Sequence, residues 1–137
     1  SSIYITVATL KYLKKGGRLT HAVAAIGTML RLKPVLTMQG DKLDTFSKAR
    51  TMHQAKQIMI DAIRSDIETR FGGVDAHQVG IDIAHTNNEA EALKFRDEVE
   101  AAFPGYKVDF LDPLSLSVSC HIGDGSLAVA VSKILQV

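Results

Sequence analysis

The chain has one cysteine, almost no net charge and no long apolar run, and each shortage excludes a class of protein. The lone cysteine, Cys120, excludes an internal disulfide and favours a reducing, cytoplasmic setting. The net charge of +1, from 16 basic and 15 acidic residues, produces no bulk field that would favour nucleic acid or an anionic membrane. The longest apolar candidate, residues 21–32, is interrupted by Arg31 and is shorter than the roughly 20 residues that span a bilayer.

The chain also lacks an initiator methionine and the basic-then-apolar start of a signal peptide. Its start reads like the middle of a fold, so we expect one domain of a longer protein. The apolar fraction of 46% and the charged fraction of 23% are ordinary for a globular domain. A chain of 137 residues can bury a real core, and we predict a single domain over residues 1–137.

Apolar periodicity, together with glycine and proline breaks, predicts short alternating helices and strands. We expect a strand or turn entering a helix over 2–13, helices over 20–30, 51–71, 89–103 and 125–134, and strands over 35–38, 43–49, 79–84, 108–110 and 116–118. In the helix over 89–103 the inward residues are expected to be Ala92, Leu93, the stem of Arg96 and Val99. Strands that alternate with helices predict an α/β (α+β) fold with helices packed on a mixed sheet.

Two glycine-flanked polar segments, residues 13–20 and 117–125, are the most informative features of the chain. Each joins an ordered-looking segment to an Ala-rich run that we predict to be helical. Glycines there let the backbone approach a ligand closely, and the amides at a helix start favour an anion. Arg18 and His121 supply a guanidinium and an imidazole that would complete a site for a carboxylate or a phosphate.

The second segment, residues 117–125, contains a cysteine, a histidine and an aspartate beside its glycines. Cys120 and His121 are neighbours at the end of a predicted strand, where successive side chains point to opposite faces, so we do not expect them to form a nucleophile–base pair. Asp124 repels an anion unless its side chain turns outward, so the backbone amides of Gly123 and Gly125 are the predicted head-group donors. The spacing of these glycines matches neither a P-loop nor a dinucleotide fingerprint.

Other polar and sulfur-containing residues have simpler structural explanations. Arg18 and His121 themselves have one, as a surface arginine beside a turn and a loop histidine. Thr51, after Lys48 and Arg50, is read as the N-cap of an exposed helix start. No pair among the remaining histidines has the i, i+4 spacing of a helical zinc site, so no metal is predicted. Four methionines are read as core rather than as a lipid slot: Met29, Met38, Met52 and Met59.

Four blocks of the sequence together resemble the C-terminal domain of the DegV family. They are Thr9–Leu19, Leu32–Leu36, Lys48–Thr51 and Ser119–Ala128, and their order and spacing match the family over essentially the whole chain. Members of that family are bacterial fatty-acid-binding proteins built from two α/β domains. The resemblance implies that the family's N-terminal domain is absent here, and Asp124 stands where the family usually has proline.

The resemblance also implies roles for particular residues. A long-chain fatty acid would place its tail in an apolar tunnel and its carboxylate near Arg18 and His121, and a separate fatty acid kinase would then form an acyl phosphate. In this reading the chain is a binding protein with no cofactor. The tail would be lined by Ile26, Met29 and Leu30.

Two functions of other classes stay open at this point. One is an enzyme acting on a small phosphorylated metabolite, in which Arg18 grips the phosphate and His121 is a general acid. The other is a regulatory or oligomerisation domain with no ligand, which dimerises through an apolar face that the missing domain would cover.

Overall fold

The computed structural model describes residues 2–7, 33–39, 42–69, 79–111 and 125–133. In chain order the elements are β1 Ser2–Thr6, β2 Lys33–Gln39, β3 Lys42–Ala49, α3 Met52–Thr69, β4 Val79–Thr86, α4 Glu89–Ala102, β5 Lys107–Phe110 and β6 Ser126–Lys133. The predicted helix over 20–30, the helical part of 2–13 and the predicted strand over 116–118 lie outside the described residues.

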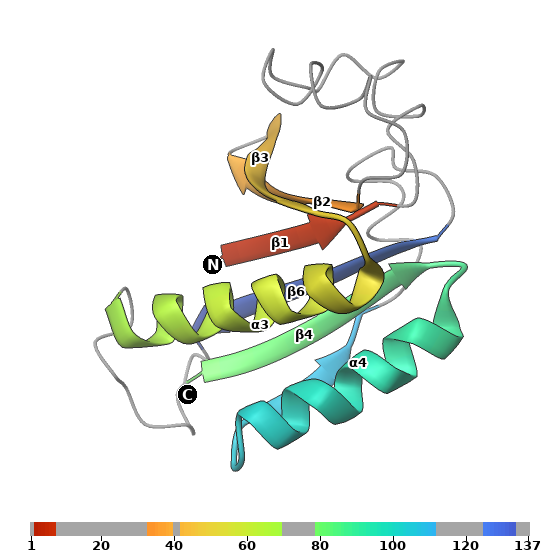
Figure 1. Ribbon diagram of the computed structural model, residues 1–137. Coiled ribbons are helices and arrows are strands. Elements are labelled where there is room, and N and C mark those ends of the chain that lie inside the picture. Colours follow the sequence, from red (N-terminus) through yellow and green to blue (C-terminus); the bar gives the residue numbers. More distant parts are fainter. Residues whose placement is uncertain (1, 8–32, 40–41, 70–78, 112–124, 134–137) are drawn as a thin grey trace.

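The six strands form one mixed sheet in the order β3-β2-β1-β6-β4-β5. All neighbouring pairs are antiparallel except β4 and β5, which are parallel and joined through α4. Both described helices lie on the same face of the sheet, where α3 contacts β1, β2, β3 and β6 while α4 contacts β4 and β5 (Figure 1). The predicted fold class, a mixed sheet with helices packed on it, is confirmed.

The long helix α3 forms where its sequence predicts it. Thr51 caps its start, because the backbone N–H of Gln54 donates to Thr51 Oγ1 at 3.1 Å. Its buried apolar residues recur at the helical period and pack against the sheet. The inward set is Ala55, Met59, Ile60, Ala62, Ile63 and Ile67.

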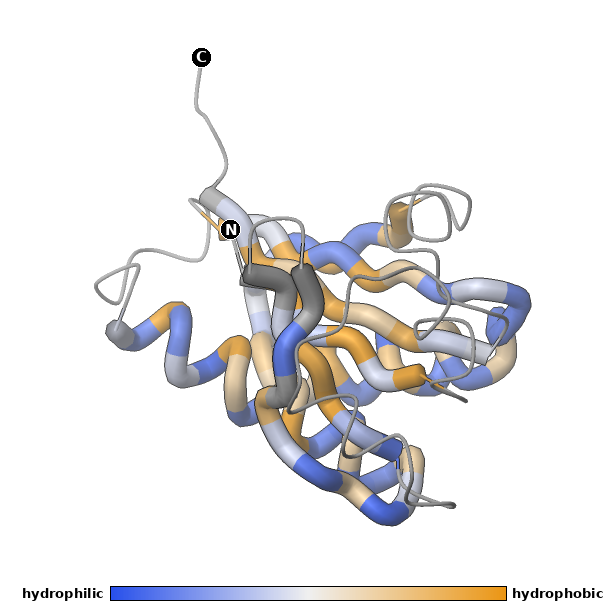
Figure 2. The backbone as a smooth tube through the Cα atoms, turned by 90° about the horizontal axis from the view of Figure 1, so that it is seen from above, coloured by the Kyte–Doolittle hydropathy of each residue, from blue (hydrophilic) through white to orange (hydrophobic). Residues whose placement is uncertain are grey.

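The core lies between the helices and the facing side chains of the strands. Alternate residues of β4 and β6 point into it, and apolar positions gather along the central strands (Figure 2). Within α4 the predicted Ala92 and Val99 are buried, but Leu93 is 40% exposed, so its inward assignment is wrong. Phe95 takes the central place instead and is fully buried.

The predicted helix over 125–134 is also wrong, because residues 126–133 form strand β6 in the middle of the sheet. Alanine content favours a helix, yet Leu127, Val129 and Val131 alternate with smaller residues as in a strand. β6 pairs with β1 on one side and with β4 on the other. Its partners in β1 lie more than a hundred positions away in the sequence, and its partners in β4 lie 40 to 54 positions away. Tertiary pairing therefore overrides the local helical preference.

The sheet face turned away from α3 and α4 carries a second row of buried residues. Leu36, Ile5, Ala128 and Ala84 are register partners across β2, β1, β6 and β4, and each is at most 3% exposed. Register partners in a sheet share a face, and these four alternate with the residues that face the helices. Two of the four are alanine, so this face is lined in part by small side chains.

Candidate functional site

The two glycine-flanked segments singled out in the sequence both attach to one end of the sheet. Because β1 runs antiparallel to β2 and β6, its end at Thr6 pairs with Val35 and Leu127, close to the starts of both neighbours. Residues 8–32 connect the end of β1 to the start of β2, and residues 112–124 connect β5 to β6. The segments that carry Arg18 and His121 therefore leave and re-enter the sheet at this same end, which lies to the right in Figure 1.

At this end a set of hydrogen bonds joins the end of β4 to the start of β6. Gly125 donates its backbone N–H to the carbonyl of Thr86 at 2.6 Å, and the N–H of Ser126 donates to Thr86 Oγ1 at 3.0 Å. The Asn88 side-chain amide donates to the carbonyl of Gly125 at 3.2 Å. We call these residues the β4–β6 bracket: Thr86, Asn88, Gly125 and Ser126.

The backbone of the bracket adopts conformations that select its residues. Gly125 has a φ of 88°, in the left-handed region where a side chain is disfavoured. Asn87, next to the bracket, has a φ of 50°, a value that asparagine tolerates better than most residues. The N–H of Asn88 donates to His85 Nδ1 at 3.1 Å, which places the proton of a neutral His85 ring on Nε2.

Of the site residues predicted from the sequence, the structure describes Gly125. The others lie outside the described residues: Arg18, Ile26, Met29, Leu30, His121 and Gly123. Gly125 precedes a strand, so the helix start expected beside it does not exist there. Its N–H is already donated to Thr86. Gly125 thus allows the backbone to adopt a left-handed conformation directly before β6.

The roles of His85 and Thr86 and the tertiary bond of Asn88 were not predicted from the sequence. Asn88 holds the N-cap position of α4, where asparagine is a favoured residue. The signal that was available is a strand ending in polar residues, followed by two asparagines. That signal marks a helix start but does not identify Gly125, 37 positions later, as the partner.

An acidic pair lies on the sheet face turned away from the helices. Asp82 pairs in register with Ala130 on β6 and with Asp109 on β5. Burial, and secondarily the negative charge of Asp109, raise the pKa of Asp82, while nearby Lys107 lowers it. Lys107 Nζ also lies 3.7 Å from Asp109 Oδ2. The surroundings on this face of the sheet therefore disfavour the charged form of Asp82.

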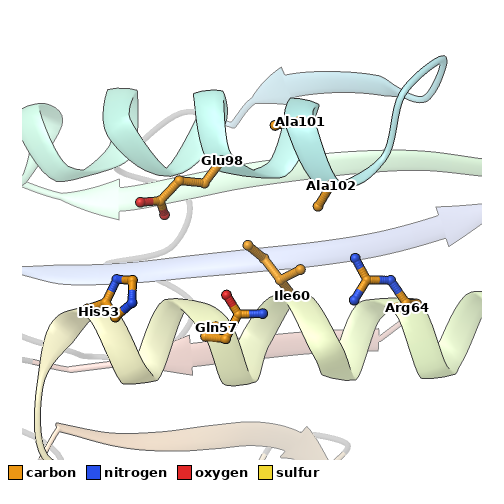
Figure 3. A pocket seen from close by; sticks show the side chains of 7 residues that line it. All are labelled: His53, Gln57, Ile60, Arg64, Glu98, Ala101 and Ala102. Carbon is orange, nitrogen blue, oxygen red and sulfur yellow. The ribbon is translucent and has the colours of Figure 1, made fainter.

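A groove of about 390 Å³ lies between α3 and α4, with His53, Gln57 and Ile60 on one wall and Glu98 on the other (Figure 3). Gln57 and Glu98, two of its polar side chains, are already engaged. Glu98 accepts from Lys56 at 3.3 Å and Gln57 donates to Asp61 at 3.2 Å. We therefore regard the groove as the outer seam of the two helices.

Thr51 is confirmed as an N-cap, and Met59 is fully buried in the core as expected, with Met52 packed against it. Among the residues that the structure describes, no three His, Cys, Asp or Glu side chains gather as a metal site. Neither described helix combines the length and the hydropathy that a membrane crossing requires.

Comparison with known proteins identifies the family. The family profile "Uncharacterised protein, DegV family" matches residues 1–133. The chain belongs to the DegV family. Among curated relatives, this DegV-family chain is 33% identical over 122 residues to the DegV domain-containing protein CA_C3284 of Clostridium acetobutylicum, covering 88% of this chain and 40% of the relative. It is 30% identical over 127 residues to Protein DegV of Bacillus subtilis, covering 92% and 42%.

Solved structures of the family share the fold. The fatty-acid-binding DegV-family protein of Thermus thermophilus superposes with a TM-score of 0.73 at 27% identity, covering 96% of this chain and 45% of that one. DegV of Bacillus subtilis, a fatty acid binding protein, superposes with a TM-score of 0.70 at 27% identity, covering 95% and 44%. The chain thus spans less than half the length of these relatives.

Proposed function

We propose that this chain binds a long-chain fatty acid, with the tail in an apolar slot and the carboxylate near Arg18 and His121. The observation that carries the proposal is family membership over residues 1–133 together with relatives that hold fatty acids. The Thermus thermophilus and Bacillus subtilis proteins are fatty acid binding. A Ruminococcus gnavus DegV-family structure, 26% identical with a TM-score of 0.71, contains vaccenic acid.

The second buried row of the sheet supports the position that we assign to the tail. Leu36, Ile5, Ala128 and Ala84 offer a continuous aliphatic strip across four strands, on the face opposite α3 and α4. Alanine side chains leave room for a ligand where larger ones would fill the space. We assign the opposite wall of the slot to the Ala-rich segment after Arg18: Ile26, Met29 and Leu30.

The common attachment of the two motif segments supports the position of the carboxylate. Both segments join the sheet at the end where β1, β4 and β6 meet, so Arg18 and His121 are tethered to neighbouring strands. A carboxylate taken out of water needs charge-assisted hydrogen bonds, which a guanidinium and an imidazole supply. Gly123 and Gly125 give the chain the freedom to pass close to the head group.

The proposal extends to partners. The chain acts as a cytoplasmic binding subunit rather than as an enzyme, and it presents the fatty acid to a fatty acid kinase for acyl-phosphate formation. A second domain, in the part of the family's length that this chain does not span, completes the head-group site. The coverage of about two fifths of the curated relatives is consistent with such a division.

The first test is denaturing extraction of the purified chain followed by mass spectrometry for fatty acids. A stoichiometric acyl ligand is expected, either from this chain or from a protein extended at its amino end. Arg18→Met should weaken fatty acid binding about tenfold or more, because a hydrogen bond to a charged group contributes about 1.5–3 kcal/mol. Arg50→Met, which removes an exposed arginine before the cap of α3, is the matched control.

The outcome that overturns the proposal is a clear one. If neither the chain nor the extended protein carries an acyl ligand, and neither can be loaded with one, fatty acid binding is wrong. If binding occurs but Arg18→Met and Arg50→Met behave alike, then the position assigned to the carboxylate is wrong while the ligand class stands.

A further inference from the structure

Asn88 occupies the N-cap position of α4, yet its side chain does not cap the helix. Asparagine is favoured there because its side-chain oxygen accepts a hydrogen bond from the first turn. In this structure the Asn88 side chain makes no such bond and donates its amide to the carbonyl of Gly125 at 3.2 Å. A local stabilising bond is thus given up for a tertiary one, the kind of exchange that proteins make at functional sites.

The surroundings hold Asn88 in this unusual role. Its backbone N–H donates to His85 Nδ1, and the preceding residue, Asn87, has a left-handed φ of 50°. On the other side, Gly125 is held by the Thr86 carbonyl at 2.6 Å in a left-handed conformation that few residues adopt. Thr86 and Ser126 are buried, so the bonds between β4 and β6 are shielded from water.

We propose that Asn88 is a positioning residue for the head-group end of the fatty-acid site. This inference rests on the proposed function. Asn88 fixes the carbonyl of Gly125 while Thr86 Oγ1 fixes the N–H of Ser126, so together they set the orientation of the peptide through which the chain enters β6. A neutral amide does this without adding a negative charge at the end of the sheet where the ligand carboxylate is placed.

The chemistry of the side chain explains why an asparagine suits this position better than other caps. Aspartate has no donor for the Gly125 carbonyl and would place a negative charge against it. Serine has a donor on a side chain that is too short to span from the N-cap to Gly125. Asn88→Ala and Asn88→Ser therefore both remove the bond to Gly125, and Asn88→Ser keeps a residue that helix N-caps favour.

The test compares a fatty acid with an ester that lacks its charge. Binding of palmitic acid and of methyl palmitate is measured by competition with a fluorescent fatty acid, for the wild-type chain, Asn88→Ala, Asn88→Ser and Thr51→Ala. Thr51→Ala removes the cap of α3 and controls for a general loss of helix stability. Both Asn88 variants are expected to weaken palmitic acid binding about tenfold, by analogy with the loss that follows removal of an outer hydrogen-bond partner at a metal site, and to leave methyl palmitate binding unchanged.

Each other outcome has a distinct meaning. If the Asn88 variants weaken the acid and the ester equally, or bind both as the wild type does, Asn88 has no head-group role and the inference is overturned while fatty acid binding stands. If the wild-type chain and its extended form bind neither ligand, the proposed function fails and the role of Asn88 fails with it. If Asn88→Ala does not fold, Asn88→Ser decides the question.

Discussion

The Tyr4 hydroxyl donates a 2.6 Å hydrogen bond to Asp66 Oδ2, and this buried bond ties the first strand of the sheet to the long helix α3. The two residues are 62 positions apart, and both are less than a tenth exposed. The Tyr4 ring also meets Phe46 of β3 edge-on, with ring centroids 4.9 Å apart. One side chain thus links three elements through a polar and an aromatic contact.

Tyr4→Phe should destabilise the fold by about 1.5–3 kcal/mol, because it leaves a buried carboxyl without this donor while the ring contact stays. The measurement is the free energy of unfolding in urea. Phe46→Leu serves as the control, since it removes the ring contact of an exposed residue and spares the hydrogen bond. An unchanged stability in Tyr4→Phe would show that the bond contributes nothing net.

Lys56 connects the two helices from a buried position. Its Nζ lies 3.2 Å from Glu91 Oε2 and 3.3 Å from Glu98 Oε1 on α4. Glu91→Gln or Glu98→Gln alone should cost about 1 kcal/mol or less, since Lys56 keeps one carboxylate. The double variant should cost about 3 kcal/mol, because the buried ammonium is then uncompensated. Strict additivity of the two single changes in urea unfolding would contradict this account.

Asp82 should make the protein less stable as the pH rises through the acidic range. Because burial raises its pKa in the folded state, the folded protein binds the proton more tightly than the unfolded chain. Stability is therefore lost between the ordinary value of 3.8 and the raised folded-state pKa, and the loss persists above it.

Asp82→Asn should remove this component, so that the variant gains stability relative to the wild type above that window and not below it. Urea midpoints of both proteins across the acidic range provide the measurement. A constant difference at every pH would mean that the substitution acts through packing rather than through the proton.

Gly125 and Gly105 offer a matched pair for testing the β4–β6 bracket. Their φ angles are 88° and 86°, so alanine at either position carries a similar backbone cost of about 1–2 kcal/mol. A Cβ at Gly105 meets no atom within 4 Å, so Gly105→Ala reports the backbone cost alone. Gly125→Ala is expected to cost more, because it also disturbs the bonds to Thr86 and Asn88. Equal losses in thermal unfolding would show that the bracket adds no stability.

Thr6 carries a buried hydroxyl that finds no hydrogen-bond partner in the part of the chain that the structure describes. Its register partners are Val35 and Leu127, both apolar and fully buried. Thr6→Val should stabilise the fold by about 1 kcal/mol, since it removes an unsatisfied polar atom and keeps the shape of the side chain. A loss of stability in calorimetry would indicate that the hydroxyl has a partner of its own.

The sequence by itself determined the elements whose cause is local. The helical repeat of apolar residues from Ala55 to Ile67 and the cap at Thr51 predict α3, and the strands predicted over 35–38 and 43–49 are present as β2 and β3. The motif blocks were enough to identify the DegV family. In each case the information lies within a few turns or within a recognisable run of residues.

The tertiary structure alone decided the elements that depend on distant partners. Residues 126–133 are rich in alanine and were expected to be helical, but pairing with β1 and β4 makes them a central strand. A long separation in sequence also hides the bond from Asn88 to Gly125, which makes the N-cap residue of α4 part of a tertiary contact. A local pattern records what a segment prefers alone, whereas strand pairing and the bracket are set by backbone groups that only the folded chain brings together.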